Sequence, residues 1–461
     1  MPAAAPALPS AALVLGAGAS GRAAARALLR RGVPVGVSVP APDPAADALA
    51  ALGAEVLVGD PAANVAAWAR RHPGSAAVFS PGIPPAAPEW AAAHAAGLRA
   101  QGELCLGCGL LHPATRLVAL TGSKGKSSVA KLLADALRAA GRPAVPCGNY
   151  GTPVCEVADL DPPPAFAVAE CSSFQLETAD ARLAPEAALL LNLSSDHLDR
   201  HGSLAAYLDA KLAIFAAQPP GALALLPEPG SAGPGAPDPL ARFRERFPGR
   251  EAETFGTGPD ARWRWRPGAV EDAAAGLRIP LSGSYFDNAV LGPAAAAAAA
   301  ILLRLGLAPG AVSGALRNFV PLPHRMQRVA LRDGVAWIDN SKATSLAALL
   351  ASVRMAPAPV LLVAGGRLKE PLAPLGKELL DSGVRKAYTI GECGGAMARA
   401  WSSALPVEDC ATLERACAAA ARDAAALRAG CVLLAPGTAS FDQFPNYAAR
   451  GDAFARLARS P

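Results

Sequence analysis

A short loop at residues 121–127, TGSKGKS, has the residue types and spacing to bind a nucleotide triphosphate. It follows the apolar run Leu117–Leu120 and leads directly into helix-forming residues. Glycines let backbone amides turn towards an anion, and the first turn of a helix adds unpaired amides and the positive end of its dipole. Lys126 would reach the β and γ phosphates, while Ser127 or Ser128 would offer a hydroxyl to Mg²⁺. We predict a compact GxxGKS phosphate loop; the alternative is a glycine turn with a chance lysine.

Carboxylate and imidazole side chains follow two later apolar runs. Glu170 ends one of these runs, and the loop after the other contains Asp196, His197, Asp199 and His201. Like charges this close together are costly unless a cation or a phosphate lies nearby. The carboxyl ends of parallel strands meet at the ligand-binding edge of an open sheet, so Glu170 and His197 could share a cation, and Mg²⁺ would favour the carboxylate oxygens. The alternative is a solvated polar loop.

A helix is predicted just beyond this loop, and it carries Tyr207 and Lys211. Residues four apart in a helix share one face, so we expect the two side chains to be neighbours. A lone helical lysine is usually a surface charge, and that is the alternative to a functional role for Lys211.

Apolar runs that alternate with helix-forming segments should position these side chains. This rhythm predicts an α/β protein with mostly parallel, doubly wound sheets. We expect three domains: a Rossmann-like N-terminal domain over residues 1–105, a central P-loop-type ATP-binding domain over 106–320, and a Rossmann-like C-terminal α/β domain over 321–461. The expected strands lie within Ala12–Leu15, Val33–Pro40, Ser75–Pro84, Leu117–Leu120, Ala165–Glu170, Ala187–Leu193, Ala222–Pro227, Val335–Asp339, Pro359–Gly366, Lys386–Gly391 and Gly430–Gly437.

Three further segments need an interpretation. The GxGxxG at Gly16, Gly18 and Gly21 could cradle a phosphate, but a nicotinamide site also needs an acidic residue at the end of the second strand, where Ser38 stands. Pro227–Pro239 is rich in proline and glycine and is predicted to be a surface excursion, not a domain boundary. The alanine run 294–300 is too short for a membrane span and is predicted to be a packed helix.

Composition excludes several classes of protein. With 52% hydrophobic and 18% charged residues over 461 positions, the chain should be globular and should contain several cores. The net charge of +5 is small and spread over the chain, so we expect no nucleic-acid partner. We also expect that the protein does not associate with a membrane. The start of the chain lacks the pattern of a signal peptide, which favours the cytoplasm. The nine cysteines are mostly isolated, and Cys105 and Cys108 are interpreted as two small buried residues because no second CxxC follows.

Seven motifs together resemble the Mur ligases. They are TGSKGKSS, GNYGTP at 148–153, ECSSFQLE at 170–177, DHLDRHGS at 196–203 with Lys211 beyond it, LPHR at 322–325, NSKATS at 340–345, and ASFDQFPNYAARGDAF at 439–454. The SFDQF stretch is most similar to the member of that family that adds D-glutamate to UDP-N-acetylmuramoyl-L-alanine. The resemblance implies an ATP-dependent amide ligase of peptidoglycan precursor synthesis that works through an acyl phosphate. We expect a monomer that binds only small molecules.

The resemblance also implies roles for individual residues. Catalysis would depend on Lys126, His197 and Lys211, with Lys211 carbamylated by CO₂. Two Mg²⁺ ions would be held by Ser127, Glu170, His197 and the carbamylated Lys211. ATP would be bound by Gly122, Ser123, Lys124, Gly125, Lys126, Ser127, Ser128, Asn288, Arg325, Asp339 and Asn340. The UDP-sugar would contact Gly18, Ala19, Ser20, Ser80, Asn149, Ser172, Gln175 and His197. The pocket for D-glutamate, a dianion, would contain Lys342, Thr344, Lys369, Ser440, Phe441 and Tyr447.

The chain departs from the pattern of the family at four places. Lys124 stands where asparagine is usual, and Asp339 and Asn340 are in reversed order, so either could meet the ATP ribose. GSYFDN at 283–288 replaces the usual adenine motif and leaves Tyr285 or Asn288 as substitutes. No residue is assigned to uracil, because Ser38 stands where aspartate or threonine is common.

Four functions are compatible with these motifs. The first is the D-glutamate-adding ligase. A related ligase that uses another amino acid, such as folylpolyglutamate synthase, is disfavoured by SFDQF and by GGRLK at 365–369. A non-catalytic nucleotide-binding homologue is disfavoured because Lys126, Glu170, His197 and Lys211 are all present. A nucleotide-linked dehydrogenase is the weakest alternative.

Overall fold

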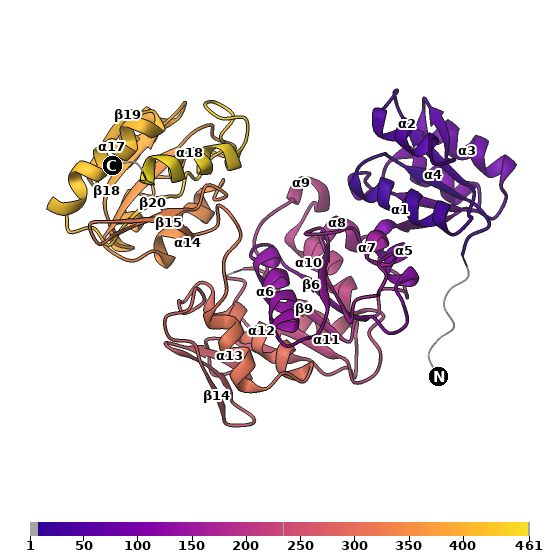
Figure 1. Ribbon diagram of the computed structural model, residues 1–461, viewed down its shortest axis with the longest axis horizontal. Helices are drawn as coiled ribbons and strands as arrows, with labels where there is room; N and C mark the ends of the chain where they lie inside the picture. The colour runs from indigo at the N-terminus through magenta and orange to yellow at the C-terminus, as the bar shows by residue number, and fades with distance from the viewer. Residues whose placement is uncertain (1–7, 234, 460–461) are drawn as a thin grey trace. The chain divides into compact units, whose positions relative to one another are not determined.

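The computed structural model describes residues 8–233 and 235–459. The chain divides into two compact units, one of residues 1–287 with 291–319 and one of residues 288–290 with 320–461. The first unit contains two sheets and the second contains one, and helices cover both faces of each sheet (Figure 1). The predicted α/β class with mostly parallel sheets is therefore confirmed.

The first sheet has five parallel strands in the order β3-β2-β1-β4-β5. Alternate residues of β1 point into separate cores: Ala12 and Val14 pack with α1 and α2, whereas Leu13 and Leu15 pack with α3 and α4. The strand order reverses at β1, so a crevice for ligands is expected beyond its carboxyl end. The elements are β1 Ala12–Leu15, α1 Ala19–Arg30, β2 Val35–Val39, α2 Pro44–Ala50, β3 Glu55–Val58, α3 Pro61–Arg71, β4 Ala76–Phe79, α4 Pro88–Ala95 and β5 Arg99–Gly102.

A helix joins the first sheet to the second. This helix, α5 (Glu103–Leu110), contains the boundary predicted between residues 105 and 106. Its Leu106 packs into the core of the first sheet, while Leu104 and Cys105 pack into the core of the second. The two sheets of the first unit therefore share a packed helix in place of an exposed linker.

The second sheet has nine strands in the order β14-β13-β12-β11-β10-β9-β6-β8-β7. Strands β7 to β12 run parallel, and β13 and β14 extend the sheet as an antiparallel meander. Because β6 lies between β8 and β9, the loops after these three strands leave the same edge. The strands are β6 Arg116–Thr121, β7 Ala144–Gly148, β8 Phe166–Glu170, β9 Ala187–Leu190, β10 Leu223–Pro227, β11 Glu253–Gly256, β12 Trp263–Arg266, β13 Ala269–Asp272 and β14 Leu277–Pro280.

Helices cover both faces of the second sheet. One face packs against α6, α12 and α13, and the other packs mainly against α5, α7 and α10. The helices are α6 Lys126–Ala139, α7 Val154–Val157, α8 Ser173–Leu176, α9 Leu198–His201, α10 Leu204–Leu212, the short 3₁₀ turn η1 Ala213–Phe215, α11 Pro239–Arg246, α12 Gly292–Arg304 and α13 Pro309–Arg317.

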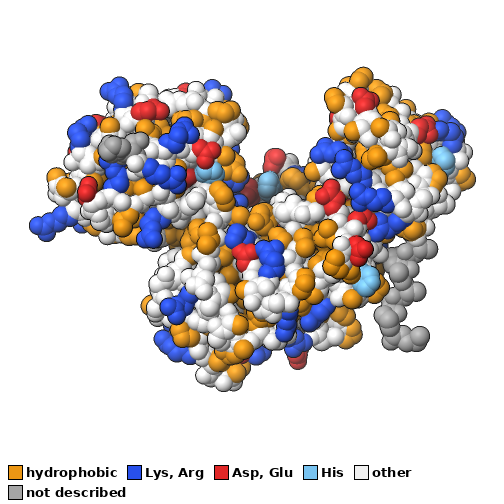
Figure 2. All heavy atoms as spheres, viewed as in Figure 1, with side chains coloured by type: hydrophobic (Ala, Val, Ile, Leu, Met, Phe, Trp, Pro, Cys, Tyr) orange, Lys and Arg blue, Asp and Glu red, His pale blue; other side chains and the backbone are white. Residues whose placement is uncertain are grey.

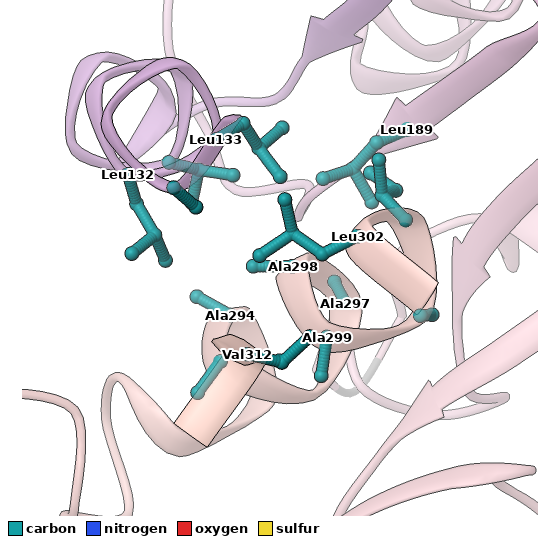
Figure 3. Packing of buried hydrophobic residues seen from close by; sticks show 14 of the residues in the cluster. Leu132, Leu133, Leu189, Ala294, Ala297, Ala298, Ala299, Leu302 and Val312 are labelled. Atoms are coloured by element: carbon teal, nitrogen blue, oxygen red, sulfur yellow. The ribbon is translucent and has the colours of Figure 1, made fainter. Parts of the chain in front are cut away.

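The alanine run forms the centre of α12, as predicted for a packed helix. Every alanine from Ala294 to Ala300 is buried. Figure 3 shows Ala298 and Leu302 of this helix next to Leu133 of α6 and Leu189 of β9. Methyl side chains let a helix approach its neighbours closely, so the run serves dense packing inside the first unit.

The third sheet, in the second unit, has six strands in the order β15-β16-β20-β17-β18-β19. Only β15 runs antiparallel to its neighbour. One face packs against α17 and α18 and the other against α14, α15 and α16. The elements are β15 Gln327–Arg332, β16 Val335–Asp339, α14 Leu346–Met355, β17 Val360–Gly365, α15 Gly376–Asp381, β18 Val384–Ile390, α16 Gly394–Trp401, β19 Val407–Ala411, α17 Leu413–Ala426, β20 Cys431–Leu434 and α18 Tyr447–Arg459.

Basic and acidic side chains are interspersed on the face of the molecule that Figure 2 shows. Among the described residues, no helix is long and apolar enough to cross a membrane. The nine cysteines are all unpaired thiols; eight are buried and Cys108 is half-buried. This agrees with the interpretation of Cys105 and Cys108 as small core residues.

Candidate active site

The phosphate loop joins β6 to α6 and has a backbone that requires its two glycines. Gly122 and Gly125 have φ angles of 154° and 82°, in the range that L side chains rarely adopt. A Cβ on Gly122 would lie 3.0 Å from the Cβ of Leu191. No side chain caps the start of α6, and no acidic residue lies in its first turn. The loop therefore presents amides and the positive end of a helix dipole to an anion.

Two lysine ammonium groups meet at one carbonyl of this loop. Lys126 Nζ donates to the Gly122 carbonyl oxygen at 2.8 Å, and Lys211 Nζ donates to the same oxygen at 2.9 Å. Lys211 is only 1% exposed, so its interpretation as a surface charge is wrong. Burial, reinforced by the charge of Lys126, lowers the pKa of Lys211 to about 7. Lys211 therefore loses its proton at a much lower pH than an ordinary lysine does.

Lys211 and Tyr207 share one face of α10, as predicted. The Lys211 ammonium lies 4.2 Å from the centre of the Tyr207 ring, and both side chains are buried. The Tyr207 hydroxyl lies 3.4 Å from Ser123 Oγ. The helix therefore brings a lysine and a phenol to the phosphate loop.

Glu170 lies at the end of β8, opposite Leu120 of β6. Its side chain is 1% exposed, and its Oε1 accepts a hydrogen bond from Asn149 Nδ2 at 2.7 Å. Its Oε2 is buried and has no hydrogen-bond partner among the described residues. A buried carboxylate oxygen in this situation is costly without a cation, so the position fits Mg²⁺, which prefers oxygen ligands.

His197 lies in the loop after β9, on the same edge of the sheet. Its φ of 54° is left-handed, and its ring makes an edge contact with Phe174 at 4.9 Å between ring centres. The neighbouring Asp196 accepts from Lys124 Nζ at 3.1 Å. Partial burial disfavours the ionised form of Asp196, but the hydrogen bond and charge of Lys124 outweigh it and lower its pKa.

The described residues contain no group of three or more His, Cys, Asp or Glu side chains arranged to hold a metal. A divalent ion at Glu170 would therefore take further oxygen ligands from hydroxyl groups, phosphates or water. This is the usual way in which proteins bind Mg²⁺ with a nucleotide.

The residues predicted for the UDP-sugar fall into two groups in the first unit. One group follows strands of the first sheet: Gly18, Ala19, Ser20 and Ser80. The other follows strands of the second sheet: Asn149, Ser172, Gln175 and His197. Gly18, Ala19 and Ser20 begin α1, after a turn at Gly16 whose added Cβ would lie 2.9 Å from Ser80 Oγ. The Ser80 hydroxyl is buried without a partner among the described residues, and Ser80 lines one small pocket together with Gln175. An unpartnered buried hydroxyl at a phosphate-type turn suits a polar ligand.

Ser172 and Gln175 also have a structural role. Ser172 Oγ accepts the Gln175 amide, and Gln175 Oε1 accepts the Ser172 amide, which forms a capping box at α8. Ser38, to which no contact was assigned, is buried and accepts a hydrogen bond from Asn64 Nδ2.

Arg200 of α9 is a site residue to which the sequence analysis gave no role. Its guanidinium pairs with Glu177 at 2.5 Å and donates to the Pro81 carbonyl at 3.2 Å. It also stacks on Phe174, 4.1 Å from the ring centre. Arg200 thus links the loop after Ser80 to the helix that follows His197.

The residues predicted for D-glutamate lie on loops after β16, β17 and β20, which are adjacent parallel strands. Lys342 Nζ lies 4.0 Å from the centre of the Tyr447 ring. Ser440 is buried, whereas Phe441 is 62% exposed. An isolated bridge between Arg367 and Ala439 brings the loop of Lys369 beside that of Ser440. Thr344, half-buried, belongs to the same loop as Lys342.

Arg450 of α18 joins these three loops and was also missed by the sequence analysis. It is 1% exposed and donates to the carbonyls of Ser341, Thr438 and Ala439 at 3.0–3.2 Å and to the Gly365 carbonyl at 3.5 Å. It also donates to Ser341 Oγ at 2.9 Å. Burial lowers its pKa to about 10. In the sequence, only the position of Arg450 inside the motif at 439–454 indicated a role for it.

The remaining residues predicted for ATP lie near the start of the second unit. Asp339 is fully buried and lies 2.7 Å from His324 Nδ1, and burial raises its pKa. Asn340 accepts the Met326 amide and donates to Ser352 Oγ, so its amide group is used within the domain. Arg325 is half-buried, and Asn288 accepts the Val290 amide. Whether Asp339 or Asn340 meets a ribose stays a prediction.

Comparison with known proteins identifies the class to which this fold and site belong. The model of the Mur ligase middle domain matches residues 120–243, which include the phosphate loop, Glu170, His197 and Lys211. The structure of MurF from Acinetobacter baumannii is similar over 97% of this chain and 93% of that chain, with a TM-score of 0.59 and 16% identity, which shows the shared fold. The chain therefore belongs to the Mur ligase family.

Its sequence relatives narrow the family to one branch. The chain is 38% identical to a UDP-N-acetylmuramoylalanine–D-glutamate ligase of Frankia casuarinae, over 97% of this chain and 93% of the relative. It is 37% identical to the protein of the same name in Myxococcus xanthus, over 82% of this chain and 83% of the relative. The predicted resemblance is thus confirmed over nearly the whole length.

Proposed function

We propose that this protein is an ATP-dependent ligase that joins D-glutamate to UDP-N-acetylmuramoyl-L-alanine in the synthesis of peptidoglycan precursors. The observation that carries the proposal is the 38% identity to a ligase of that name over 97% of the chain. The convergence of Lys126, Lys211 and Glu170 at the edge of the central sheet supports it. The same residues make a non-catalytic nucleotide-binding role a poor alternative.

The reaction needs activation of a carboxylate. The oxygen of a carboxylate is a poor leaving group, so the γ-phosphoryl of ATP is first transferred to the alanyl carboxylate, which breaks the bond to the β-phosphate, releases ADP and gives an acyl phosphate. The neutral amine of D-glutamate then attacks the acyl carbon and loses a proton, an amide bond forms, and phosphate leaves with the bonding electrons. Both steps gather negative charge, which Lys126 and the amides of the phosphate loop stabilise in place.

The Mg²⁺ ions that such a reaction uses would be held by Ser127 and Glu170 at one site and by His197 and Lys211 at another. The buried, unpartnered Oε2 of Glu170 supports the first site. When bound, Mg²⁺ neutralises phosphate charge and polarises the transferring group. The protein itself contributes the anion-binding amides and fixes the positions of these ligand side chains.

We further propose that Lys211 acts as a carbamate. Only a neutral amine adds to CO₂, and the pKa of about 7 leaves a substantial neutral fraction of Lys211. The addition forms an N–C bond and releases one proton, which converts a cation into an anion beside the predicted metal. The contact of Lys211 with the Gly122 carbonyl supports the proposal, because it keeps the amine at the phosphate loop.

D-Glutamate would bind in the second unit, between the loops that Arg450 joins. Lys342, Lys369 and the hydroxyls of Thr344 and Ser440 suit a dianion, because opposite charge and hydrogen-bond donors both favour carboxylates. We also propose that the protein works as a monomer in the cytoplasm, where ATP and UDP-linked precursors are present, without a nucleic-acid partner.

The decisive experiment measures phosphate release by the purified protein with ATP, Mg²⁺ and UDP-N-acetylmuramoyl-L-alanine. We expect rapid release only when D-glutamate is added, with an amide product of the corresponding mass. Release with L-lysine or diaminopimelate in place of D-glutamate would contradict the proposed specificity. ATP binding without turnover on any of these amines would favour the non-catalytic alternative.

A further inference from the structure

We infer that Asn192 is a positioning residue that holds the phosphate loop in its anion-binding shape and ties it to the loop of His197. Asn192 follows Leu191, just after the end of β9, and the sequence analysis gave it no role. The role in turnover rests on the proposed ligase function, whereas the effect on nucleotide binding does not.

All hydrogen-bonding atoms of the Asn192 amide point at the phosphate loop. Its Oδ1 accepts the backbone amides of Ser123 at 3.0 Å and Lys124 at 2.9 Å. Its Nδ2 donates to the Lys124 carbonyl at 2.9 Å. The Ser123 amide also lies 3.1 Å from the Asn192 carbonyl oxygen. One side chain therefore contacts all three peptide groups between the two glycines of the loop.

These contacts decide which amides of the loop can meet an anion. The amides of Ser123 and Lys124 are used inside the protein, so they face Asn192. The amides that a triphosphate can meet therefore begin at Gly125 and continue into the first turn of α6. Without the Asn192 side chain, the Lys124 amide and the Lys124 carbonyl would lose this partner, and the Ser123 amide would keep only the Asn192 carbonyl, so the loop would be held less firmly in this shape.

The same region connects the phosphate loop to the predicted metal ligand His197. Ser123 Oγ donates to the Ser194 carbonyl at 3.1 Å and accepts the Ser194 amide at 3.0 Å. Further along, Lys124 pairs with Asp196 at 3.1 Å, next to His197. Together with the contacts of Asn192, these bonds join residues 121–125 and 192–197 in one hydrogen-bond network. A disturbance at Asn192 should reach His197 as well as the nucleotide.

Asparagine is the residue type that this position requires. Aspartate would accept the two amides, but it could not donate to the Lys124 carbonyl, and it would place a negative charge next to a bound triphosphate. Alanine would remove all three side-chain hydrogen bonds and leave only the bond of the Ser123 amide to the main-chain carbonyl of residue 192. Asparagine therefore fits this position because it combines an acceptor for the two amides and a donor for the carbonyl without a charge.

The test compares Mg²⁺-ATP binding by the wild-type protein, Asn192→Ala and Asn192→Asp, each as the full chain, using calorimetry without the other substrates. We expect the dissociation constant to rise roughly tenfold or more for Asn192→Ala, since three hydrogen bonds to the loop are lost. We expect a larger rise for Asn192→Asp, because charge repulsion is added while the two amide contacts remain. If one variant fails to fold, the other still decides the inference.

Gln218→Ala is the matched control. Gln218 is a buried amide side chain of the central domain, whereas Asn192 is half-buried, and the Gln218 Nε2 donates to the Pro185 and Leu223 carbonyls at the opposite edge of the sheet. We expect it to lower the melting temperature about as much as Asn192→Ala does, with ATP affinity unchanged. A merely structural role of Asn192 would give the same result for both variants, and this outcome would overturn the inference. Unchanged or tighter ATP binding by folded Asn192→Ala would also overturn it.

The ligase assay separates this inference from the proposed function. In that assay the Michaelis constant for ATP should rise in Asn192→Ala, while the constant for D-glutamate, whose predicted pocket lies in the second unit, should change little. A wild-type protein that binds ATP but does not join D-glutamate would refute the proposed function and leave the binding comparison valid. Hydrogen exchange at residues 121–128 should speed up in Asn192→Ala and not in Gln218→Ala, and protection equal to the wild type would contradict the inference.

Discussion

At the scale of single residues, Lys211 has the most unusual chemistry. Its amine is buried and beside a second lysine, and both effects disfavour the ammonium form. A protonated amine cannot add to CO₂, so the chemistry of Lys211 should follow its titration. Because its pKa is about 7, far below the ordinary value of 10.5, the neutral form becomes the major one as the pH rises through 7.

We therefore predict that the amount of CO₂ adduct on Lys211 rises as the pH increases from about 6 to about 8 at constant dissolved CO₂. Native mass spectrometry of the intact protein would show the adduct, and Lys211→Ala would not form it. Lys211→Ala should also lose most of its turnover, and added acetate or formate should restore part of it by supplying a carboxylate. Normal activity of Lys211→Ala would remove the carbamate from the mechanism.

The sequence predicted some site residues and missed others for a physical reason. Lys126 and Glu170 were found because a phosphate loop and a carboxylate at a strand end have local signatures, whereas the role of Lys211 came only from the resemblance to the Mur ligases. Asn192, Arg200 and Arg450 were missed because a polar side chain gives no sign of a partner that lies far along the chain. Arg450 contacts the carbonyl of Gly365, 85 residues away. Arg200 and Arg450 lie inside quoted motifs, and that was the available signal for them.

At the scale of elements, the buried parallel strands were the most predictable. Val335–Asp339 was predicted with the observed bounds of β16, because a fully buried strand is a continuous apolar run between loops. Strands β12 and β13 were not predicted. In β12 the sequence WRWR alternates apolar and charged residues at the outer part of the sheet, and in β13 the sequence AVED ends in two acidic residues. Such short strands are defined by their neighbours more than by their own composition.

The alanine-rich helix α12 gives a prediction at this scale. Ala298 is fully buried and belongs to the same core cluster as Leu133 of α6 (Figure 3), and protein cores are packed with few voids. We expect Ala298→Leu to lower the free energy of unfolding of the first unit by about 1–3 kcal/mol. Ala241→Leu, on the exposed face of α11, should change it by less than about 0.5 kcal/mol. Denaturant unfolding measures both; equal stability of the two variants would refute tight packing at α12.

At the scale of the whole molecule, the chain is two compact units, and each contains its own hydrophobic clusters. The fold class and the presence of several α/β domains followed from the alternation of apolar runs and helices. The joining helix α5 did not, because its sequence ELCLGCGL has neither a clear helical period nor the polar composition of a linker.

This division predicts that heating unfolds the full-length protein in two steps. Mg²⁺-ATP at about one hundred times its dissociation constant should raise the midpoint of the step that includes the phosphate loop, since a ligand at this ratio stabilises the folded state by about 2.7 kcal/mol. Temperature-dependent hydrogen exchange of peptides from β6 and from β17 assigns each step to its unit. A single transition with identical midpoints in both sets of peptides would contradict independent units.

Arg450 has a consequence for how ligases of this kind diversify. All but one of its contacts are to main-chain carbonyls, and the exception is the Ser341 hydroxyl. Because Arg450 holds these loops through main-chain groups, most of the side chains on the loops can be exchanged without loss of its hydrogen bonds. A preference for another amino-acid substrate can therefore evolve, or be engineered, by substituting the loop residues one at a time while the hydrogen bonds of Arg450 stay the same.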